Sequence, residues 1–301
     1  MKEIYIYGTG RKALQFLPVI GLHYIVKGFV DSNVEKCKGQ LMGLPVCHVS
    51  DLTDLDFDNI LIVSSFADEI EAELKRYKLQ GTSIETIPEL TDLYREYYLA
   101  EEHYRQSVND AIPRTPLFNK HLQGAELLTS RKALLRRLPV NGIAAELGVA
   151  NGDFSSSILS VNSPSKLHLI DIWGSQRYNN SLYKNVLQKF NTEISKGKME
   201  IHRKLSTEAV EDFEDNYFDW LYIDTSHCYK GTKAELELYA SKVKTGGVIA
   251  GHDYMMGNWT KQYRYGVMEA VHEFCVNAGW RIKFLTMDMS ENQSFAIERI
   301  R

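Results

Sequence analysis

The sequence predicts an α/β protein in which two parallel-sheet units are joined by a helical connector. Two glycine-rich loops, at residues 8–13 and 145–155, each follow a short apolar run and precede a helical stretch. Apolar runs typical of strands alternate with helical stretches on both sides of the connector, and this alternation favours parallel sheets with crossover helices. We therefore expect a first unit at 1–90, a connector at 91–138 and a larger domain at 139–301.

Composition excludes several classes of protein. The 301 residues are 44% hydrophobic and 25% charged, which is ordinary for a globular enzyme and excludes a disordered or collagen-like chain. The formal net charge of −4 argues against a nucleic-acid partner. The four cysteines form no C-x-x-C pair, which fits a reducing compartment. No signal-peptide core and no membrane-length apolar stretch is present, so we expect a cytoplasmic protein without a membrane partner.

The first unit begins with a candidate nucleotide site. Its expected strands and helices alternate along the chain, at residues 4–7, 11–20, 24–30, 59–63 and 67–77. The loop after the first strand fits G-x-G-x-x-A, in which Gly8 and Gly10 would let a pyrophosphate approach the backbone. Asp31 ends the second strand, where an acid accepts ribose hydroxyls.

This unit resembles the N-terminal, Rossmann-like domain of bacterial sugar acyltransferases that carry a left-handed β-helix. The resemblance rests on the glycine loop, on Lys-Gly-Phe-Val-Asp at 27–31 and on Gly-Leu-Pro-Val at 43–46. It implies a nucleotide or nucleotide-sugar ligand, while a scaffold or docking role is the alternative. A nicotinamide-dependent oxidoreductase is a further alternative, although no Tyr/Lys or His/Asp set for hydride transfer lies nearby.

The connector is expected to be helical. Aromatic and aliphatic residues recur at spacings of three and four over 90–108, which is one face of an amphipathic helix, and Pro113 stops that helix. A second helix is expected from about 125 to 138, closed by Pro139. We interpret the aromatic stripe as a packing surface or as a dimer contact, the latter predicting a homo-oligomer.

The larger domain returns to strands and helices. Its expected strands lie at residues 143–147, 167–170, 199–202, 218–223 and 247–250. The loop after the first of these contains Glu146, Gly148 and Gly152, and Asp171 follows about 20 residues later. Ligands of open α/β sheets bind beyond the carboxyl ends of the strands, so these residues form the second candidate nucleotide site.

From about residue 142 onward the chain is similar to class I S-adenosylmethionine-dependent methyltransferases, which implies that fold and that cofactor. The resemblance places Glu146 at the amino-acid end of the cofactor, the two glycines along its path and Asp171 at its ribose. It also places Trp173 and Ser206 near the adenine. Ala150 stands where the family has its middle glycine.

Two further motifs follow successive strands, D-T-S-H-C-Y at 224–229 and G-H-D-Y at 251–254. They resemble a bacterial methyltransferase subfamily that includes O-methyltransferases of macrolide sugars, although Ser226 stands where relatives often carry an acid. The resemblance implies methylation of a hydroxyl on a sugar or glycosylated small molecule, such as a nucleotide-sugar or glycan precursor. The segment 255–265, with Trp259, is expected to cover the substrate.

The residue types of these motifs suggest how the reaction proceeds. His227 titrates near neutral pH and is the expected general base. Asp224 and Asp253 offer oxygen ligands to Mg²⁺, which would lower the pKa of neighbouring substrate hydroxyls. His252 either completes this site or supports Asp253, and without a metal Asp224 would orient His227. A non-catalytic S-adenosylmethionine-binding protein is the remaining alternative.

Overall fold

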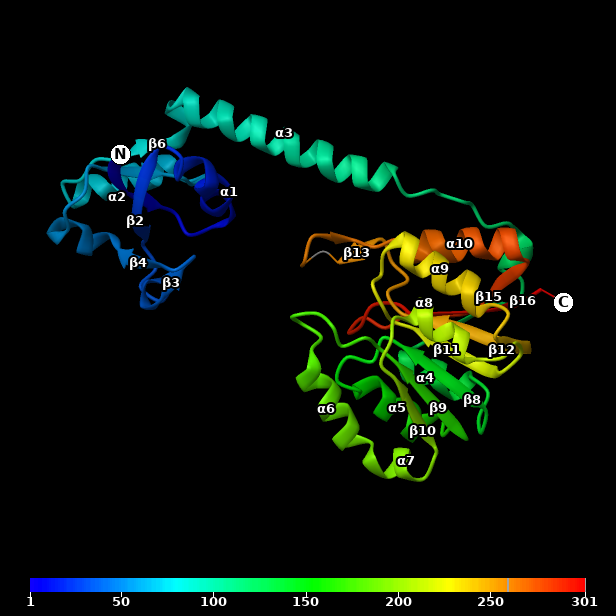
Figure 1. Cartoon of the computed structure of the whole chain (residues 1–301). Helices are drawn as coiled ribbons and strands as arrows, with labels where there is room; N and C mark the ends of the chain where they lie inside the picture. Colours follow the sequence, from blue (N-terminus) through cyan, green and yellow to red (C-terminus); the bar gives the residue numbers. More distant parts are fainter. Residues whose placement is uncertain (259, 301) are drawn as a thin grey trace. The chain divides into compact units, whose positions relative to one another are not determined.

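The computed structural model describes residues 1–258 and 260–300, so Trp259 lies outside the described residues. The chain forms two compact units, Met1–Ser107 and Val108–Arg301. Each is an α/β unit built on a mainly parallel sheet (Figure 1), which confirms the predicted fold class. In the described part of the chain no helix is both long enough and apolar enough to span a bilayer.

The first unit contains a six-stranded sheet in the order β3-β4-β2-β1-β5-β6, in which the β3–β4 pair is antiparallel and the other pairs are parallel. Its strands are β1 (Lys2–Tyr7), β2 (Tyr24–Asp31), β3 (Gln40–Leu41), β4 (Leu44–His48), β5 (Asn59–Ile62) and β6 (Thr82–Ser83). Its helices are α1 (Arg11–Ile20), α2 (Ala67–Arg76) and the start of α3 (Pro88–Asp110). Successive residues of β1 point to opposite faces, so Ile4 and Ile6 enter one core while Tyr5 and Tyr7 enter another.

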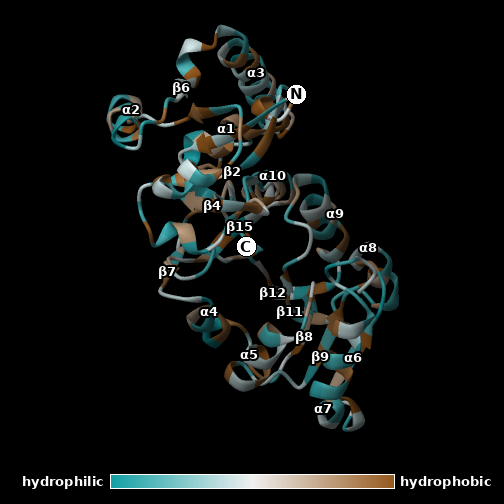
Figure 2. Ribbon diagram, turned by 90° about the vertical axis from the view of Figure 1, so that its left-hand side faces the viewer, coloured by the Kyte–Doolittle hydropathy of each residue, from teal (hydrophilic) through white to brown (hydrophobic). Residues whose placement is uncertain are grey.

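Helix α3 corresponds to the amphipathic helix expected in the connector. Among its described residues Leu90 is buried, and Tyr94 stacks on Phe16 of α1 with ring centroids 3.9 Å apart. Figure 2 shows both hydrophobic and hydrophilic residues on this helix. Its later apolar side chains are exposed, namely Tyr97, Tyr98, Leu99, Tyr104 and Val108. The start of the stripe is therefore a packing surface, and a dimer contact further along stays a prediction.

The second unit contains an eight-stranded sheet in the order β10-β9-β8-β11-β12-β16-β15-β7. Its strands are β7 (Glu126–Leu128), β8 (Ile143–Leu147), β9 (Lys166–Ile170), β10 (Met199–His202), β11 (Phe218–Ile223), β12 (Val243–Gly251), β15 (Trp280–Thr286) and β16 (Phe295–Arg299). Strand β16 is antiparallel to both neighbours. The helices are α4 (Arg131–Arg137), α5 (Asp153–Val161), α6 (Asn180–Lys189), α7 (Asn191–Ser195), α8 (Ser206–Ala209), α9 (Tyr229–Tyr239) and α10 (Val267–Ala278). A small hairpin pairs β13 (Gly257–Asn258) with β14 (Tyr263–Arg264).

The helix expected from about 125 to 138 is shorter in the structure. Residues Glu126–Leu128 form β7, which pairs with β15, and the helix begins only at Arg131. The hydroxyl of Ser130 accepts the backbone N–H of Ala133 at 3.2 Å, and this cap fixes the start of α4. Part of the expected connector therefore belongs to the second sheet. The domain boundaries expected at residues 90 and 138 stay a prediction.

Helices cover both faces of the second sheet. Leu236 of α9 and Phe274 of α10 bury against one face, while Leu135 of α4, Ile158 of α5 and Val186 of α6 bury against the other. Helices α9 and α10 lie side by side (Figure 1). Strands β9 and β10 lie on one side of β8, and β11 and β12 lie on the other. The carboxyl ends of β8 and β11 therefore form a topological switch point, where open α/β sheets bind ligands.

Candidate functional site

The loop after β8 packs against the end of β11 at this switch point. Gly148 has a φ of +87°, and a Cβ at this residue would lie 2.0 Å from the carbonyl oxygen of Asp224. Gly152 has a φ of +75°, and a Cβ there would lie 2.6 Å from the ring of Phe190. Both backbone conformation and close approach therefore require glycine at the two predicted positions. Their contact with a cofactor stays a prediction.

Asp171, at the end of β9, holds this loop in place. Its Oδ2 accepts the backbone N–H groups of Val149 at 2.9 Å and of Ala150 at 3.0 Å. Its Oδ1 accepts the N–H of Trp173 at 3.0 Å. The structure thus brings Asp171 beside the glycine loop, as expected, and gives it a role in shaping that loop. Binding of a ribose by the same carboxylate stays a prediction.

Glu146 is buried at the end of β8, beneath the loop. Its Oε2 accepts the hydroxyl of Ser155 of α5 at 2.5 Å. Burial raises the pKa of Glu146 to about 8, although the Ser155 hydrogen bond and the charge of Arg131 act to lower it. The carboxyl group is therefore mostly protonated at neutral pH. A cationic ligand beside it would favour the ionised form.

The two residues expected near the adenine are both held by protein contacts. The indole of Trp173 is buried, and its Nε1 donates to the carbonyl oxygen of Ala150 at 2.8 Å. Ser206 begins α8, and its hydroxyl donates to the buried carboxyl group of Glu235 at 2.5 Å. Glu235 also accepts the hydroxyl of Thr225 at 2.7 Å, and burial raises the pKa of Glu235 despite both hydrogen bonds. Contact of Trp173 and Ser206 with an adenine stays a prediction.

His227 and Asp253 form a pair across the ends of β11 and β12. Nδ1 of His227 lies 2.9 Å from Oδ2 of Asp253, while the side-chain amide of Asn292 donates to Oδ1 at 2.5 Å. Burial would lower the pKa of His227, but the hydrogen bond and charge of Asp253 outweigh it and raise that pKa. Burial would raise the pKa of Asp253, but its hydrogen bonds to the two neighbouring imidazoles lower it instead. With Nδ1 directed at the carboxylate, Nε2 is the nitrogen suited to take a proton from a substrate.

Asp224 faces an arginine that the sequence analysis missed. Nη2 of Arg131 lies 2.6 Å from Oδ2 of Asp224, and its Nε donates to the hydroxyl of Tyr222 at 2.7 Å. The guanidinium carbon also lies 3.5 Å from the ring centroid of Phe154. The partner of Asp224 is therefore Arg131, and the carboxylate that contacts His227 is Asp253 rather than Asp224. Arg131 is one of several basic residues in α4, and no spacing in the sequence distinguishes it.

His252 lies between the two aspartates. Its Nδ1 is 3.7 Å from Oδ2 of Asp224 and 3.5 Å from Oδ2 of Asp253. Its Nε2 is buried and has no hydrogen-bond partner among the described residues. An unpartnered buried polar group costs about 1–3 kcal/mol. His252 and His227 both line the same small cavity.

Strained backbone gathers at the same edge of the sheet. Ala150, Trp173, His227 and Asp253 have φ values of +52°, +44°, +57° and +57°. They lie in the loops after β8, β9, β11 and β12, respectively. A left-handed conformation costs a non-glycine residue roughly 1–2 kcal/mol. Such strain concentrates at functional sites, where it holds side chains in orientations that relaxed loops do not provide.

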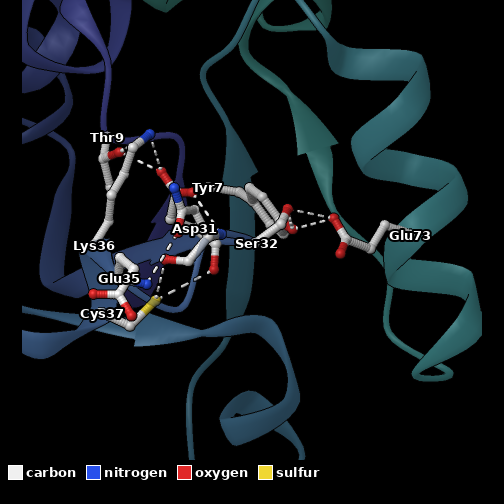
Figure 3. Close-up of polar contacts among 9 residues, drawn as sticks. Tyr7, Thr9, Asp31, Ser32, Glu35, Lys36, Cys37 and Glu73 are labelled. Carbon is white, nitrogen blue, oxygen red and sulfur yellow. Dashed lines mark hydrogen bonds and ion pairs between the residues drawn. The ribbon is translucent and has the colours of Figure 1, made fainter.

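The predicted residues of the first unit also come together. Gly8 donates its N–H to the carbonyl oxygen of Val30 at 3.0 Å, which brings the loop after β1 beside the end of β2. The carboxylate of Asp31 accepts the hydroxyl of Thr9 and lies 2.9 Å from Nζ of Lys36 (Figure 3). Burial would raise the pKa of Asp31, but these hydrogen bonds lower it. Binding of a nucleotide by these residues stays a prediction.

Comparison with protein families identifies the core of the second unit. Residues 145–254 match the family model described as a methyltransferase domain. This segment is similar to a methyltransferase domain. It includes the glycine loop, both downstream motifs and every residue predicted above for cofactor binding or catalysis in this unit, whereas Arg131 lies outside it. A second family model, described as C2185-like, N-terminal, matches residues 1–85. Neither match supports a nicotinamide-dependent oxidoreductase.

Several solved structures are similar to the chain. Methyltransferase FkbM from Methylobacillus flagellatus is 11% identical with a TM-score of 0.45, covering 98% of this chain and 90% of that one. SMU.1697c from Streptococcus mutans, in complex with SAH, is 12% identical with a TM-score of 0.42, covering 56% and 95%. The tRNA methyltransferase TrmK from B. subtilis is 11% identical with a TM-score of 0.42, covering 57% and 67%. No functional conclusion rests on likenesses this distant, and no curated protein matches the sequence.

Proposed function

We propose that the protein is an S-adenosylmethionine-dependent methyltransferase that methylates a hydroxyl group of a sugar or of a glycosylated small molecule. The observation that supports this reaction most directly is the His227–Asp253 pair, with 2.9 Å between Nδ1 and Oδ2, inside a methyltransferase domain. A carboxylate-bound imidazole is a suitable base for a hydroxyl, which is a poor nucleophile until it loses its proton.

The glycine loop and its two acids suit the proposed cofactor. Glu146, whose ionised form a nearby cation favours, would face the ammonium group, and Asp171 would accept the ribose hydroxyls. Gly148 and Gly152 keep side chains out of the path between them. When bound, S-adenosylmethionine supplies a methyl carbon made electrophilic by the adjacent sulfonium.

His227 and Asp253 are the residues proposed to handle the proton of the substrate hydroxyl. Nε2 of His227 would take the proton of the substrate hydroxyl, so that the oxygen could accept the methyl group that S-adenosylmethionine would supply. Asp253 keeps its bond to Nδ1 and so stabilises the imidazolium that forms. The segment 255–265 is proposed to cover the substrate and to exclude bulk water during the reaction.

Mg²⁺ is a proposed additional component. Asp224, His227 and Asp253 each present a ligand atom within 4.8 Å of the others, and two carboxylates fit this hard cation. Asp224 and Asp253 would hold the ion, which would lower the pKa of adjacent substrate hydroxyls. Arg131 contacts Oδ2 of Asp224 and would compete with the ion for this carboxylate. Activity lost to EDTA and restored by Mg²⁺ would support the metal, and EDTA-insensitive turnover would exclude it.

The decisive test of the enzyme is methyl transfer. Purified protein is incubated with methyl-labelled S-adenosylmethionine and a panel of nucleotide-sugars and glycosides, and donor binding is measured by calorimetry. Labelled product that carries an O-methyl group supports the proposal. Donor binding without transfer to any member of the panel favours the non-catalytic alternative, and absence of donor binding refutes both.

For the first unit we propose a nucleotide or nucleotide-sugar ligand. A Cβ at Gly10 would meet no heavy atom within 4 Å, so the start of α1 offers open space beside Asp31 and Lys36. Backbone N–H groups at a helix start and a nearby lysine suit a diphosphate. Calorimetry with UDP-N-acetylglucosamine, compared between wild type and Lys36→Met, tests this. Equal heats from both would show that the ligand binds without Lys36, and no heat from wild type favours a scaffold or docking role.

A further inference from the structure

A second cluster of metal-ligand side chains lies away from the proposed active site, on the edge strand β10 and its neighbour β9. His168 pairs in register with Glu200, and His202 follows two residues later on β10. Residues that are paired, or two apart on one strand, point to the same face of a sheet, so all three side chains converge. His168 also contacts the rings of Phe213 and Phe218, beneath the face covered by α8 and α9.

The separations between the ligand atoms suit a tetrahedral metal. Nδ1 of His168 and Nε2 of His202 are 3.0 Å apart. Glu200 places Oε2 3.9 Å from the former nitrogen and Oε1 3.8 Å from the latter. Ligands bound tetrahedrally at about 2.0–2.1 Å lie roughly 3.3–3.4 Å from one another. The nitrogen–nitrogen distance is shorter than this value and the two nitrogen–oxygen distances are longer. Small side-chain rotations would bring the three ligand atoms to tetrahedral separations.

The outward nitrogen of each imidazole is already engaged by a protein oxygen. Nδ1 of His202 lies 3.2 Å from Oδ2 of Asp212, and Nε2 of His168 lies 3.1 Å from the hydroxyl of Tyr217. A proton on Nδ1 of His202, held by the carboxylate, leaves the lone pair of Nε2 directed at His168. If His168 likewise donates to Tyr217, two lone pairs face each other across 3.0 Å, an arrangement that a cation between them resolves. Metal-bound histidines carry such outer partners, which fix their tautomers.

The exposure of the cluster also suits a metal. The side chains of His168 and His202 are 3% and 10% exposed, whereas that of Glu200 is 50% exposed, which leaves an entry from the sheet edge. Lys166 lies 2.7 Å from Oε2 of Glu200 and would compete for that carboxylate.

We propose that His168, His202 and Glu200 form a binding site for Zn²⁺ or a similar divalent transition metal, with Asp212 as the positioning residue of His202. Two imidazoles and one carboxylate favour such ions over Mg²⁺ or Ca²⁺, which prefer oxygen ligands. The ion would tie the edge strand β10 to β9 and is independent of the methyltransferase reaction.

The experiment uses the full-length, tag-free protein, stripped with EDTA and titrated with Co²⁺ as a spectroscopic probe and then with Zn²⁺. One equivalent of Co²⁺ with the intense visible bands of tetrahedral coordination, displaced by Zn²⁺, is the expected result. His202→Asn and Glu200→Gln should weaken or abolish these bands, and Asp212→Asn should lower affinity about 10–100-fold. Glu200 is half exposed, so its variant should fold even where His202→Asn does not.

The control separates this site from the Asp224 cluster. His227→Asn removes a ligand atom from that other cluster and should leave the Co²⁺ bands at β10 unchanged. Bands lost in His227→Asn but kept in Glu200→Gln would overturn the proposal. So would wild-type protein that binds no Co²⁺ or Zn²⁺, which would show the two histidines to be a hydrogen-bonded pair.

Discussion

Replacing Glu146 by glutamine should change how the stability of the protein depends on pH. The unfolded chain releases the proton of this carboxyl group near its ordinary pKa of 4.5, whereas burial in the folded protein raises the pKa to about 8. Between these values the folded state keeps a proton that the unfolded state has lost. The free energy of unfolding therefore falls as the pH rises through this interval.

The size of the effect follows from the two pKa values. Integrated from pH 5.5 to pH 7.5, the proton linkage of Glu146 removes about 2.5 kcal/mol of stability. Glutamine cannot ionise, and its amide oxygen can still accept the Ser155 hydroxyl. Glu146→Gln should therefore gain about 2.5 kcal/mol of stability relative to wild type as the pH rises from 5.5 to 7.5. For a unit of this size the difference corresponds to roughly 5–10 °C in Tm.

The assay is urea unfolding of both proteins at the two pH values, with Tm measured alongside. Glu208→Gln, at an exposed glutamate of α8, shows what the loss of one carboxylate charge does by itself. The difference in free energy of unfolding between wild type and Glu146→Gln is compared at the two pH values. A difference that stays constant within about 0.5 kcal/mol would refute the buried, protonated state of Glu146. A difference that moves in the opposite direction would show that Glu146 is ionised and paired in the folded protein.

Three further predictions concern the charged residues of the site. His227→Ala should lower kcat by about 10²- to 10⁴-fold in protein that still binds the methyl donor by calorimetry; equal kcat would remove His227 as the base. Asp253→Asn should shift the acid limb of the kcat/KM profile to lower pH, because the charge that raises the pKa of His227 is lost; a limb that moves upward contradicts this pairing. Arg131→Met should lower stability by about 2–3 kcal/mol in urea unfolding, since it leaves the partly buried Asp224 without its partner, and Arg131→Lys should restore part of the loss.

Local sequence signals predicted the strands that lead to the site but not the whole sheet. Strands β8, β9 and β11 are short, continuous apolar runs, and such runs indicate buried parallel strands. The two C-terminal strands β15 and β16 were not predicted. Buried and partly exposed residues alternate along β15, which is a detectable period of two. Its place beside β7 depends on contacts between residues far apart in the chain, which no local pattern specifies.

The sequence predicted which motifs meet at the site. It did not predict which side chains pair with one another there. Parallel topology brings the ends of β11 and β12 to one edge, so His227 and Asp253 were expected there together. Which carboxylate contacts His227 depends on the positive φ values at both residues, and single-residue backbone conformation is not encoded in motif spacing. Arg131 enters from a helix that starts before β8, so the residue that pairs with Asp224 lay outside every motif.

If the proposed function is correct, the charges at the site couple binding of the methyl donor to the protonation state of His227. Asp224 is paired with Arg131, and Asp253 is paired with His227. A neutral His227, which catalysis requires, leaves the negative charge of Asp253 without that counter-charge, and a sulfonium cation is the kind of group that such a charge attracts. The same cation disfavours a protonated imidazole nearby, because like charges lower the pKa of a histidine. Donor binding and deprotonation of His227 therefore favour each other, so the base is most available when the methyl group is in place.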